Sequence, residues 1–281
     1  MRNLILILTG LFIIGCGSES KIIEEKEEVE EITEQTLNPK EMLREAYQLF
    51  KEGDDEASIK LANQVLEIGK TTQNDTLIGN ALTSLCRNAQ RSLDTIRLTE
   101  LSKKLVDLSA SSGDQKWMMY RAHMNAEMWR LIGNMDRAEQ FYDESMAISS
   151  EIGAMGMFTI DHFNKSFVST AKGDFETANN LIKRYYELRE QEGQAPEDAY
   201  GLIALTYLLE QKEDYKGAHE VAIVTRRLFK TQNIFPEPPD EKPLLMVEQK
   251  VQSVLDSSVL NEISASSTSE SVSSLLDKYL K

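Results

Sequence analysis

Residues 173–178 read Gly-Asp-Phe-Glu-Thr-Ala, and residues 133–138, 40 positions earlier, read Gly-Asn-Met-Asp-Arg-Ala. At the same 40-residue spacing in both directions stand short polar residues that favour the start of a helix. We call each of them a cap, and the set the capping column. The column consists of Asp54, Asp94, Asn134, Asp174 and Asp214. A fixed period of this length is typical of stacked helical units, and it disfavours a globule built around one central pocket.

Neighbouring columns keep this period and carry the residue types that packed helix hairpins need. Eight positions before each cap, a small residue suits a close helix crossing, in Ala46, Cys86, Ala126, Ser166 and Thr206. Four positions after the cap, most residues are again small, in Ser58, Leu98, Ala138, Ala178 and Ala218. Directly before the cap, glycine supplies the left-handed conformation that ends a helix, in Gly53, Gly133 and Gly173. Each unit is therefore predicted to be an antiparallel helix hairpin in an all-α fold.

The two turns quoted above resemble the Gly-Asp-Tyr-x-x-Ala turn of the tetratricopeptide repeat (TPR). Ala126 and Trp129, three positions apart, match the small and aromatic positions in the first helix of that repeat. The resemblance covers five units in residues 39–231 and implies a right-handed superhelical solenoid of helix hairpins. Because the period exceeds the common 34-residue form, each helix should be longer by nearly one turn. The second unit departs most, with Leu93 and Leu98 in place of Gly and Ala.

Residues 232–281 are predicted to form a Pro-rich spacer followed by capping helices. Residues 235–239 read Phe-Pro-Glu-Pro-Pro, which favours an extended segment. One face of a following helix is apolar, formed by Leu244, Val247, Val251, Val254 and Leu255. Ser267 and Glu270 have capping-box spacing ahead of a last short helix. These helices would cover the last repeat, although the Ser-rich residues 264–274 also suit a flexible linker.

The amino terminus has the pattern of a secretion signal in residues 1–15, with an apolar run too short for a permanent membrane span. Residues 13–16, Ile-Ile-Gly-Cys, resemble the bacterial lipobox, which implies a lipoprotein acylated at Cys16, with palmitate-like chains that give stable anchoring. The alternatives are an ordinary signal peptide with an incidental Cys or an uncleaved anchor. Gly17 stands where Asp would imply retention in the inner membrane, so the cell outer membrane is the expected location.

Residues 16–38 form an acidic segment that is expected to act as an extended tether, with a short exposed helix as the alternative. The full chain has 31 Lys and Arg against 46 Asp and Glu, a formal net charge of -15. Loss of Arg2 with the signal leaves 30 minus 46, or -16. This balance argues against nucleic acid and against lying flat on anionic lipid, and it permits basic protein partners.

No sequence motif indicates an enzyme, a cofactor or a metal site. Phosphate loops and nucleophile elbows are missing from the sequence, and His123, His162 and His219 lack zinc-site spacing. Asp161 beside His162 is interpreted as a pair on a helix surface. Cys86 falls in the small-residue column, so we expect it to be buried. An enzyme would need residues that only the superhelix brings together.

In TPR arrays the ligand contacts recur at fixed positions of the first helix of each hairpin, on the concave groove. Carried onto this chain, the candidate groove residues are Asn80, Arg87, Arg91, Tyr120, His123, Arg130, Phe163, Phe167, Tyr200 and Tyr207. The hypothesis is that the three Arg hold an acidic segment of a partner while the aromatic residues bury its apolar side chains. The alternative is that Arg87 and Arg130 pair with nearby Glu and that Phe163 and Phe167 belong to the core.

The resemblance to outer-membrane TPR lipoproteins of barrel assembly, pilus assembly and peptidoglycan-hydrolase control implies a membrane-anchored adaptor or scaffold. It would bind an envelope protein or peptide in the bacterial cell envelope. The alternative is a solute-capture lipoprotein whose groove holds a peptide or a glycan. A glycan is disfavoured because the 2 Trp, Trp117 and Trp129, do not form a cluster of stacking platforms.

Overall fold

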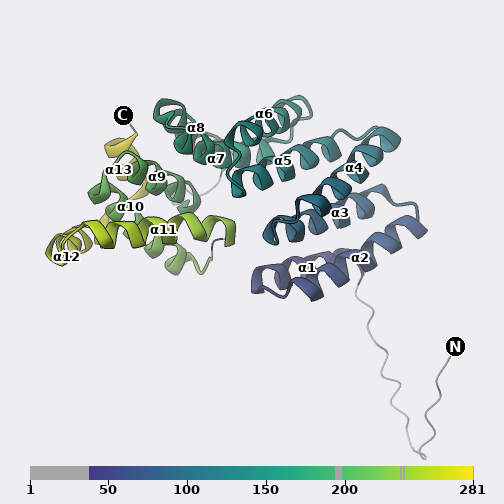
Figure 1. The fold of residues 1–281 in the computed structure, drawn as a ribbon, viewed down its shortest axis with the longest axis horizontal. Helices are drawn as coiled ribbons and strands as arrows, with labels where there is room; N and C mark the ends of the chain where they lie inside the picture. Colours follow the sequence, from purple (N-terminus) through teal and green to yellow (C-terminus); the bar gives the residue numbers. More distant parts are fainter. Residues whose placement is uncertain (1–37, 194–197, 235, 237, 281) are drawn as a thin grey trace, which may run out of the picture. The chain divides into compact units, whose positions relative to one another are not determined.

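The computed structural model describes residues 38–193, 198–234, 236 and 238–280, which form helices and no β-strand (Figure 1). The signal peptide, Cys16 and nearly all of the acidic segment lie outside these residues. Five helix hairpins follow one another. Their first helices, called the A-helices, are α1 (Pro39–Glu52), α3 (Asp75–Arg91), α5 (Lys116–Leu131), α7 (Met155–Ala171) and α9 (Ala199–Gln211). Their second helices, called the B-helices, are α2 (Asp55–Thr71), α4 (Thr95–Ser112), α6 (Met135–Glu151), α8 (Phe175–Gln191) and α10 (Tyr215–Gln232).

The capping column is confirmed in all five hairpins. At the start of each B-helix the predicted cap side chain accepts a hydrogen bond from the backbone N–H three residues on, in Asp54, Asp94, Asn134, Asp174 and Asp214. Such a bond satisfies one of the helix N–H groups that have no partner within the helix. The first A-helix starts in the same way, because Asn38 and Glu41 form a reciprocal capping box.

The small-residue column is also confirmed, since all five members are 0% exposed, in Ala46, Cys86, Ala126, Ser166 and Thr206. The turn column adopts a left-handed conformation whether or not its residue is glycine. Gly133 has φ of 87°, Leu93 has φ of 55° and Glu213 has φ of 62°. The second hairpin therefore makes the same turn as its neighbours in spite of its Leu.

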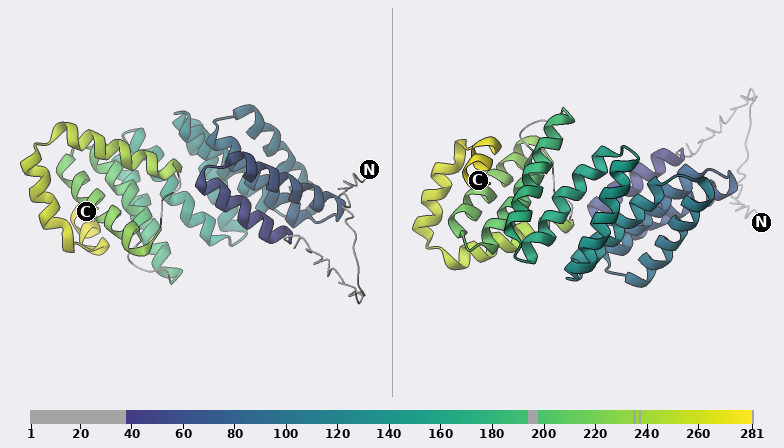
Figure 2. Two further views of the ribbon diagram at one scale, coloured as in Figure 1. Left: turned by 90° about the horizontal axis from the view of Figure 1, so that it is seen from below. Right: turned by 90° about the horizontal axis from the view of Figure 1, so that it is seen from above.

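The two helices of each hairpin pack against each other, and successive A-helices also pack together. Helix α3 lies against both α1 and α5, and α9 lies against α7. Figure 2 shows the hairpins side by side in two further views. The apolar core falls into a cluster from α2 to α5, a cluster from α7 to the carboxyl terminus, and a small cluster of Ala126, Ala138, Tyr142 and Val168. Each hairpin thus buries its apolar face against its neighbours, as in a TPR-like all-α solenoid.

The segment after α10 differs from the prediction of an extended spacer through residue 239. Helix α11 (Pro238–Val254) starts within that Pro-rich run, because proline is tolerated in the first turn of a helix. It packs on α9 and α10 and buries Leu244, Val247 and Val251. Its apolar face was predicted to include Val254, which is wrong, because Val254 is exposed at the last helical residue.

The Ser-rich residues form α12 (Ser257–Ser266), the 3-10 helix η1 (Ser267–Ser269) and α13 (Val272–Tyr279). All three pack on α10, and Val272 and Leu275 are buried there. The predicted capping box at Ser267 is wrong, because Ser271 caps α13 and accepts from the N–H of Ser274. Within the described part of the chain, no helix is both long and apolar enough to cross a membrane.

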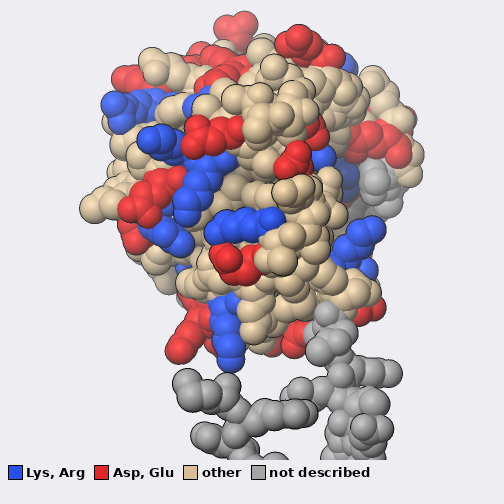
Figure 3. All heavy atoms as spheres, turned by 90° about the vertical axis from the view of Figure 1, so that its right-hand side faces the viewer, with Lys and Arg blue, Asp and Glu red and all other residues tan. Residues whose placement is uncertain are grey.

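Charges of both signs lie close together on the surface. Figure 3 shows one face, on which Lys and Arg side chains lie among Asp and Glu. Several of these charges pair across helices, as Lys172 does with Asp136 at 2.8 Å and with Glu139 at 2.7 Å. Exposed pairs of this kind add little to stability.

Candidate partner-binding surface

Two of the candidate cations lie on α3, where they face aromatic rings of α1. The guanidinium of Arg91 lies 3.8 Å from the centre of the Phe50 ring, and its Nη1 is 2.9 Å from Asp55 Oδ1. The guanidinium of Arg87 lies 5.2 Å from the centre of the Tyr47 ring. Among the described residues, Arg87 has no ion pair. Arg91 is therefore already neutralised, whereas Arg87 keeps a charge that a partner carboxylate can meet.

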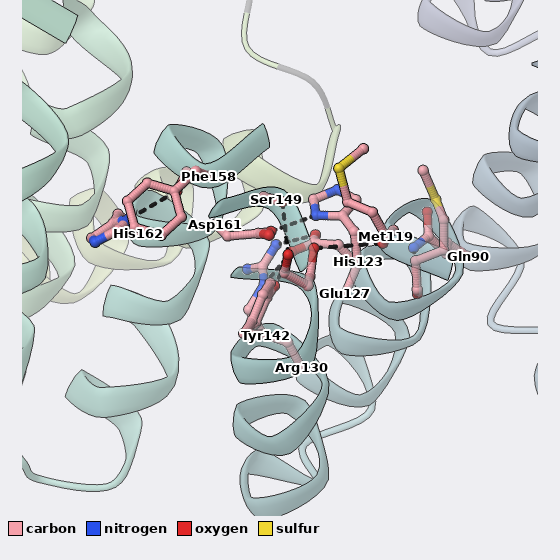
Figure 4. A network of polar contacts seen from close by, with 12 residues as sticks. Gln90, Met119, His123, Glu127, Arg130, Tyr142, Ser149, Phe158, Asp161 and His162 are labelled. Atoms are coloured by element: carbon pink, nitrogen blue, oxygen red, sulfur yellow. Dashed lines mark hydrogen bonds and ion pairs between the residues drawn. The ribbon is translucent and has the colours of Figure 1, made fainter. Parts of the chain in front are cut away.

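The third candidate cation, Arg130, belongs to a buried network (Figure 4). Its Nη2 lies 2.7 Å from Glu127 Oε2, and Tyr142 donates its hydroxyl to the other carboxylate oxygen. Burial alone would raise the pKa of Glu127, but Arg130 and His123 outweigh burial and hold that pKa below its usual value. Arg130 is only 8% exposed, so it pairs with Glu127 and does not reach a partner.

His123 joins α5 to α7. Its Nδ1 lies 2.7 Å from Oδ1 of Asp161, and both side chains are buried. Burial opposes the charged imidazole, but the Asp161 carboxylate outweighs burial, so the pKa of His123 is raised. His123 thus links two repeats. Asp161 was interpreted as half of a surface pair with His162, which is wrong: it is fully buried, and His162 instead contacts the Phe158 carbonyl oxygen at 2.8 Å.

The aromatic candidates form a contiguous group. The ring centres of Phe163 and Phe167 are 5.1 Å apart, those of Phe163 and Tyr200 are 6.4 Å apart, and those of Phe167 and Tyr207 are 5.8 Å apart. Phe163 and Phe167 are buried, so they belong to the core and the alternative to groove contact holds for them. Tyr200 and Tyr207 are half-buried at the edge of this group.

The two remaining candidates lie elsewhere on the A-helices. Tyr120 is half-buried beside Trp117, with ring centres 6.1 Å apart, and Asn80 is exposed on α3. The structure thus divides the ten candidates into buried side chains and side chains that solvent reaches. The buried side chains are His123, Arg130, Phe163 and Phe167. The solvent-accessible side chains are Asn80, Arg87, Arg91, Tyr120, Tyr200 and Tyr207.

A pocket of about 550 Å³ lies between α9 and α11, and Tyr207 is its one member from the predicted set. We call it the α9–α11 pocket. Its lining consists of Tyr207, Glu210, Gln211, Met246, Val247, Gln249, Lys250 and Ser253. A second pocket of about 430 Å³ shares Met246 and Gln249 with it, and both residues are exposed. The lining of the α9–α11 pocket combines apolar atoms with one acidic residue, Glu210, and one basic residue, Lys250, as binding sites do.

The lining residues of this pocket that lie on α11 were not identified from the sequence. Residues 232–281 were assigned to a spacer and caps because of the Pro-rich run at residues 235–239 and the apolar helix face that follows it. The one signal in the sequence is that Val247 and Lys250 stand 40 positions after Tyr207 and Glu210. The small-residue column does not extend to α11, because Met246, 40 positions after Thr206, is 58% exposed.

The described residues contain neither a cluster of metal ligands nor an activated cysteine thiol. No group of three or more His, Cys, Asp or Glu within them lies close enough to hold a metal ion. Burial raises the pKa of the Cys86 thiol to about 12, so the thiolate that reacts as a nucleophile is suppressed.

No family model matches the chain, and no curated protein matches it. Among solved structures, the chain is similar to the TPR-like repeats of a protein from Podosopora anserina assigned as a kinesin light chain. The identity is 16%, the match covers 69% of this chain and 98% of that chain, and the TM-score is 0.46. On its own hairpins, caps and turns, the described chain is a TPR-like helical array.

Proposed function

We propose that this protein is a scaffold that binds a partner protein or peptide on its A-helix face, with the α9–α11 pocket at the centre of the contact. The observation that carries this proposal is the pocket itself, about 550 Å³ between the last A-helix, α9, and helix α11. Its volume lies within the range of ligand sites, and Tyr207, Met246 and Val247 supply apolar contact area. Exposed Lys250 and half-buried Glu210 add charges that select orientation.

Of the three Arg that were expected to hold an acidic segment of a partner, only Arg87 has no carboxylate partner among the described residues. Arg91 and Arg130 have carboxylate partners within the chain, so Arg87 is the residue left to meet a partner carboxylate on α3. One such contact on a chain of net charge -15 does not make an acid-specific groove. The partner is therefore expected to be chosen mainly by apolar contact at the α9–α11 pocket.

We place this scaffold at the bacterial cell envelope, anchored through lipid on Cys16 and facing its partner from the end of the acidic tether. The lipobox-like residues 13–16 support the anchor. The function is binding and not catalysis. Capture of a small solute is the second candidate, because a pocket of 550 Å³ also fits a peptide fragment or a small ligand.

A cross-linking pull-down from native membranes tests the proposal with Met246→Asp. Met246 is 58% exposed and lines both pockets, so this substitution charges the proposed contact without disturbing the core. The matched control is Val254→Asp, an exposed residue of the same helix outside both pockets. We expect the partner to be lost with Met246→Asp and kept with Val254→Asp. Retention of the partner by both variants would sink the groove proposal, and the absence of any protein partner would favour solute capture.

A further inference from the structure

The second hairpin carries apolar residues at turn positions where the other hairpins do not. Two residues after the cap, four of the five units have a charged residue, in Glu56, Asp136, Glu176 and Lys216. The second unit has Ile96, which is 75% exposed and is the most exposed of the large apolar side chains described. Exposed single apolar residues are common, but this one interrupts a charged column.

Leu93, at the turn that precedes α4, is also an apolar residue at a position where the other hairpins have Gly or Glu. Three of the corresponding positions are glycine, whereas Leu93 holds a left-handed φ of 55° and is 49% exposed. A side chain in that conformation costs roughly 1–2 kcal/mol relative to the right-handed one. Leu93 is only about half-buried, so the second hairpin leaves a second large apolar side chain partly exposed close to Ile96.

Ile96 borders a third pocket of about 410 Å³, which lies between α4, α5 and the start of α6. Its walls include Leu98, Met128 and Trp129, of which Leu98 and Met128 are buried and Trp129 is half-buried. The volume is at the small end of the range for ligand sites, so it accommodates a few side chains and not a folded domain. We call it the Ile96 pocket.

The charges of the Ile96 pocket favour an acidic occupant. Glu100 is already engaged by Arg97 at 3.1 Å. Arg137 lies with its guanidinium 4.4 Å from the centre of the Trp129 ring and, among the described residues, has no ion pair. A guanidinium held on an aromatic face is oriented for a carboxylate and still keeps its charge.

We propose that the Ile96 pocket binds a short segment of a partner protein that presents a large aliphatic side chain next to a carboxylate. The aliphatic group packs against Ile96 and Trp129, and the carboxylate pairs with Arg137. This surface is separate from the α9–α11 pocket, since the two share no lining residue. Together with the contact proposed at the α9–α11 pocket, on which this step rests, the scaffold would have two separate sites for partner segments.

Calorimetric titration of the full chain with three synthetic peptides tests this assignment. The probe is N-acetyl-Leu-Glu-Leu-Glu-Leu amide, and its two comparison peptides replace every Glu by Lys or every Leu by Ala. Long-range attraction to a chain of net charge -15 favours the Lys peptide, so a preference for the Glu peptide requires a local cationic site. We expect binding of the Glu and Leu probe at least tenfold tighter than that of either comparison peptide.

The variants Ile96→Glu and Arg137→Glu locate the binding. Glu occupies the position of Ile96 in the first and fourth hairpins, so Ile96→Glu is compatible with the turn. Each variant is expected to weaken the probe at least tenfold, whereas Val106→Asp, at an exposed site of the same helix, leaves it unchanged. No measurable binding of the probe, equal binding of the Lys peptide, or unchanged affinity in both variants overturns the proposal. Loss of the probe with Met246→Asp instead overturns it by assigning the peptide to the α9–α11 pocket.

Discussion

Glu127 is the side chain on which the buried network depends. It is held by Arg130 from the next turn of α5 and by the hydroxyl of Tyr142 from α6. Pairing of Arg130 with a nearby Glu is the alternative to partner contact that the sequence offers, and Glu127 is suited to it because residues three apart share a helix face. Spacing could not show that Tyr142 would seal that pair from solvent, because this depends on how closely α6 packs on α5.

Arg130→Met is expected to lower the free energy of unfolding by about 3 kcal/mol, because it leaves the Glu127 carboxylate buried without its cation. Urea unfolding at pH 7 followed by circular dichroism measures the loss. Glu127→Gln combined with Arg130→Met removes both charges, so it should recover most of that stability. A loss below about 1 kcal/mol in the single variant would show that Glu127 is solvated.

The pair of His123 and Asp161 predicts a pH dependence. Because the pKa of His123 is raised in the folded chain, its contribution to stability is complete below about pH 6.5, the ordinary value of histidine. That contribution is lost as the pH rises through the raised pKa. Urea unfolding between pH 6 and pH 9 should therefore show falling stability, and His123→Gln should flatten that fall.

His162→Gln is the control for this measurement. Burial lowers the pKa of His162, so its contribution is complete above pH 6.5 and is lost only as the pH falls. The fall in stability above pH 6.5 should persist in this variant. The same slope in His123→Gln as in the parent chain contradicts the assignment. The neighbours Asp161, Glu127 and Arg87 also set the pKa of His123.

At the scale of the elements, the turn after α3 is made by Leu93 in the conformation that glycine prefers. Leu93→Gly should raise the free energy of unfolding by roughly 0.5 kcal/mol, because it removes left-handed strain at a smaller cost in chain entropy. Gly133→Leu makes the reverse change in the next hairpin and should lower stability by about 1 kcal/mol. Thermal or urea unfolding of both variants measures these shifts. Destabilisation by Leu93→Gly would mean that the Leu93 side chain contributes more contact energy than its exposure indicates.

The helix hairpins were predictable from the sequence because each is defined locally. A cap, a turn residue and a small residue at fixed spacing are enough to specify where two helices start and cross, as Asp174, Gly173 and Ser166 show. The helix after the Pro-rich run was predicted from its apolar face, but its start was not, because Pro238 and Pro239 disfavour a helix interior and yet suit a first turn. The α9–α11 pocket was missed because this helix was assigned to a cap on the last repeat and not to a binding face.

The candidate site was predictable only in part. Repeat positions identified the A-helix face, and Tyr207 does line a pocket. Phe163 and Phe167 occupy the same kind of position, but they are buried against Tyr185, Tyr200 and Tyr207. Whether such a residue faces a ligand or the core depends on neighbouring aromatic side chains, which helical spacing does not encode.

At the scale of the whole molecule, the lipid anchor remains a prediction. Cys16→Ser removes the thiol that would carry the acyl chains, so the protein should move from the membrane fraction to the soluble fraction. Fractionation with immunoblotting measures this change. Cys86→Ser is the matched control, because Cys86 is buried in the array and should not affect membrane attachment. Membrane retention of Cys16→Ser would mean that the lipobox interpretation is wrong.

The proposed function requires that a partner contacts the A-helix face at the α9–α11 pocket. Site-specific photo-cross-linking in cells that carry the native gene tests it most directly, with the photoreactive residue at Gln211, which is exposed and lines the pocket. Lys183, exposed on the B-helix α8, is the reference position. We predict one discrete protein adduct from Gln211 and none from Lys183. Equal adducts from both positions, or no adduct from Gln211, would contradict the claim.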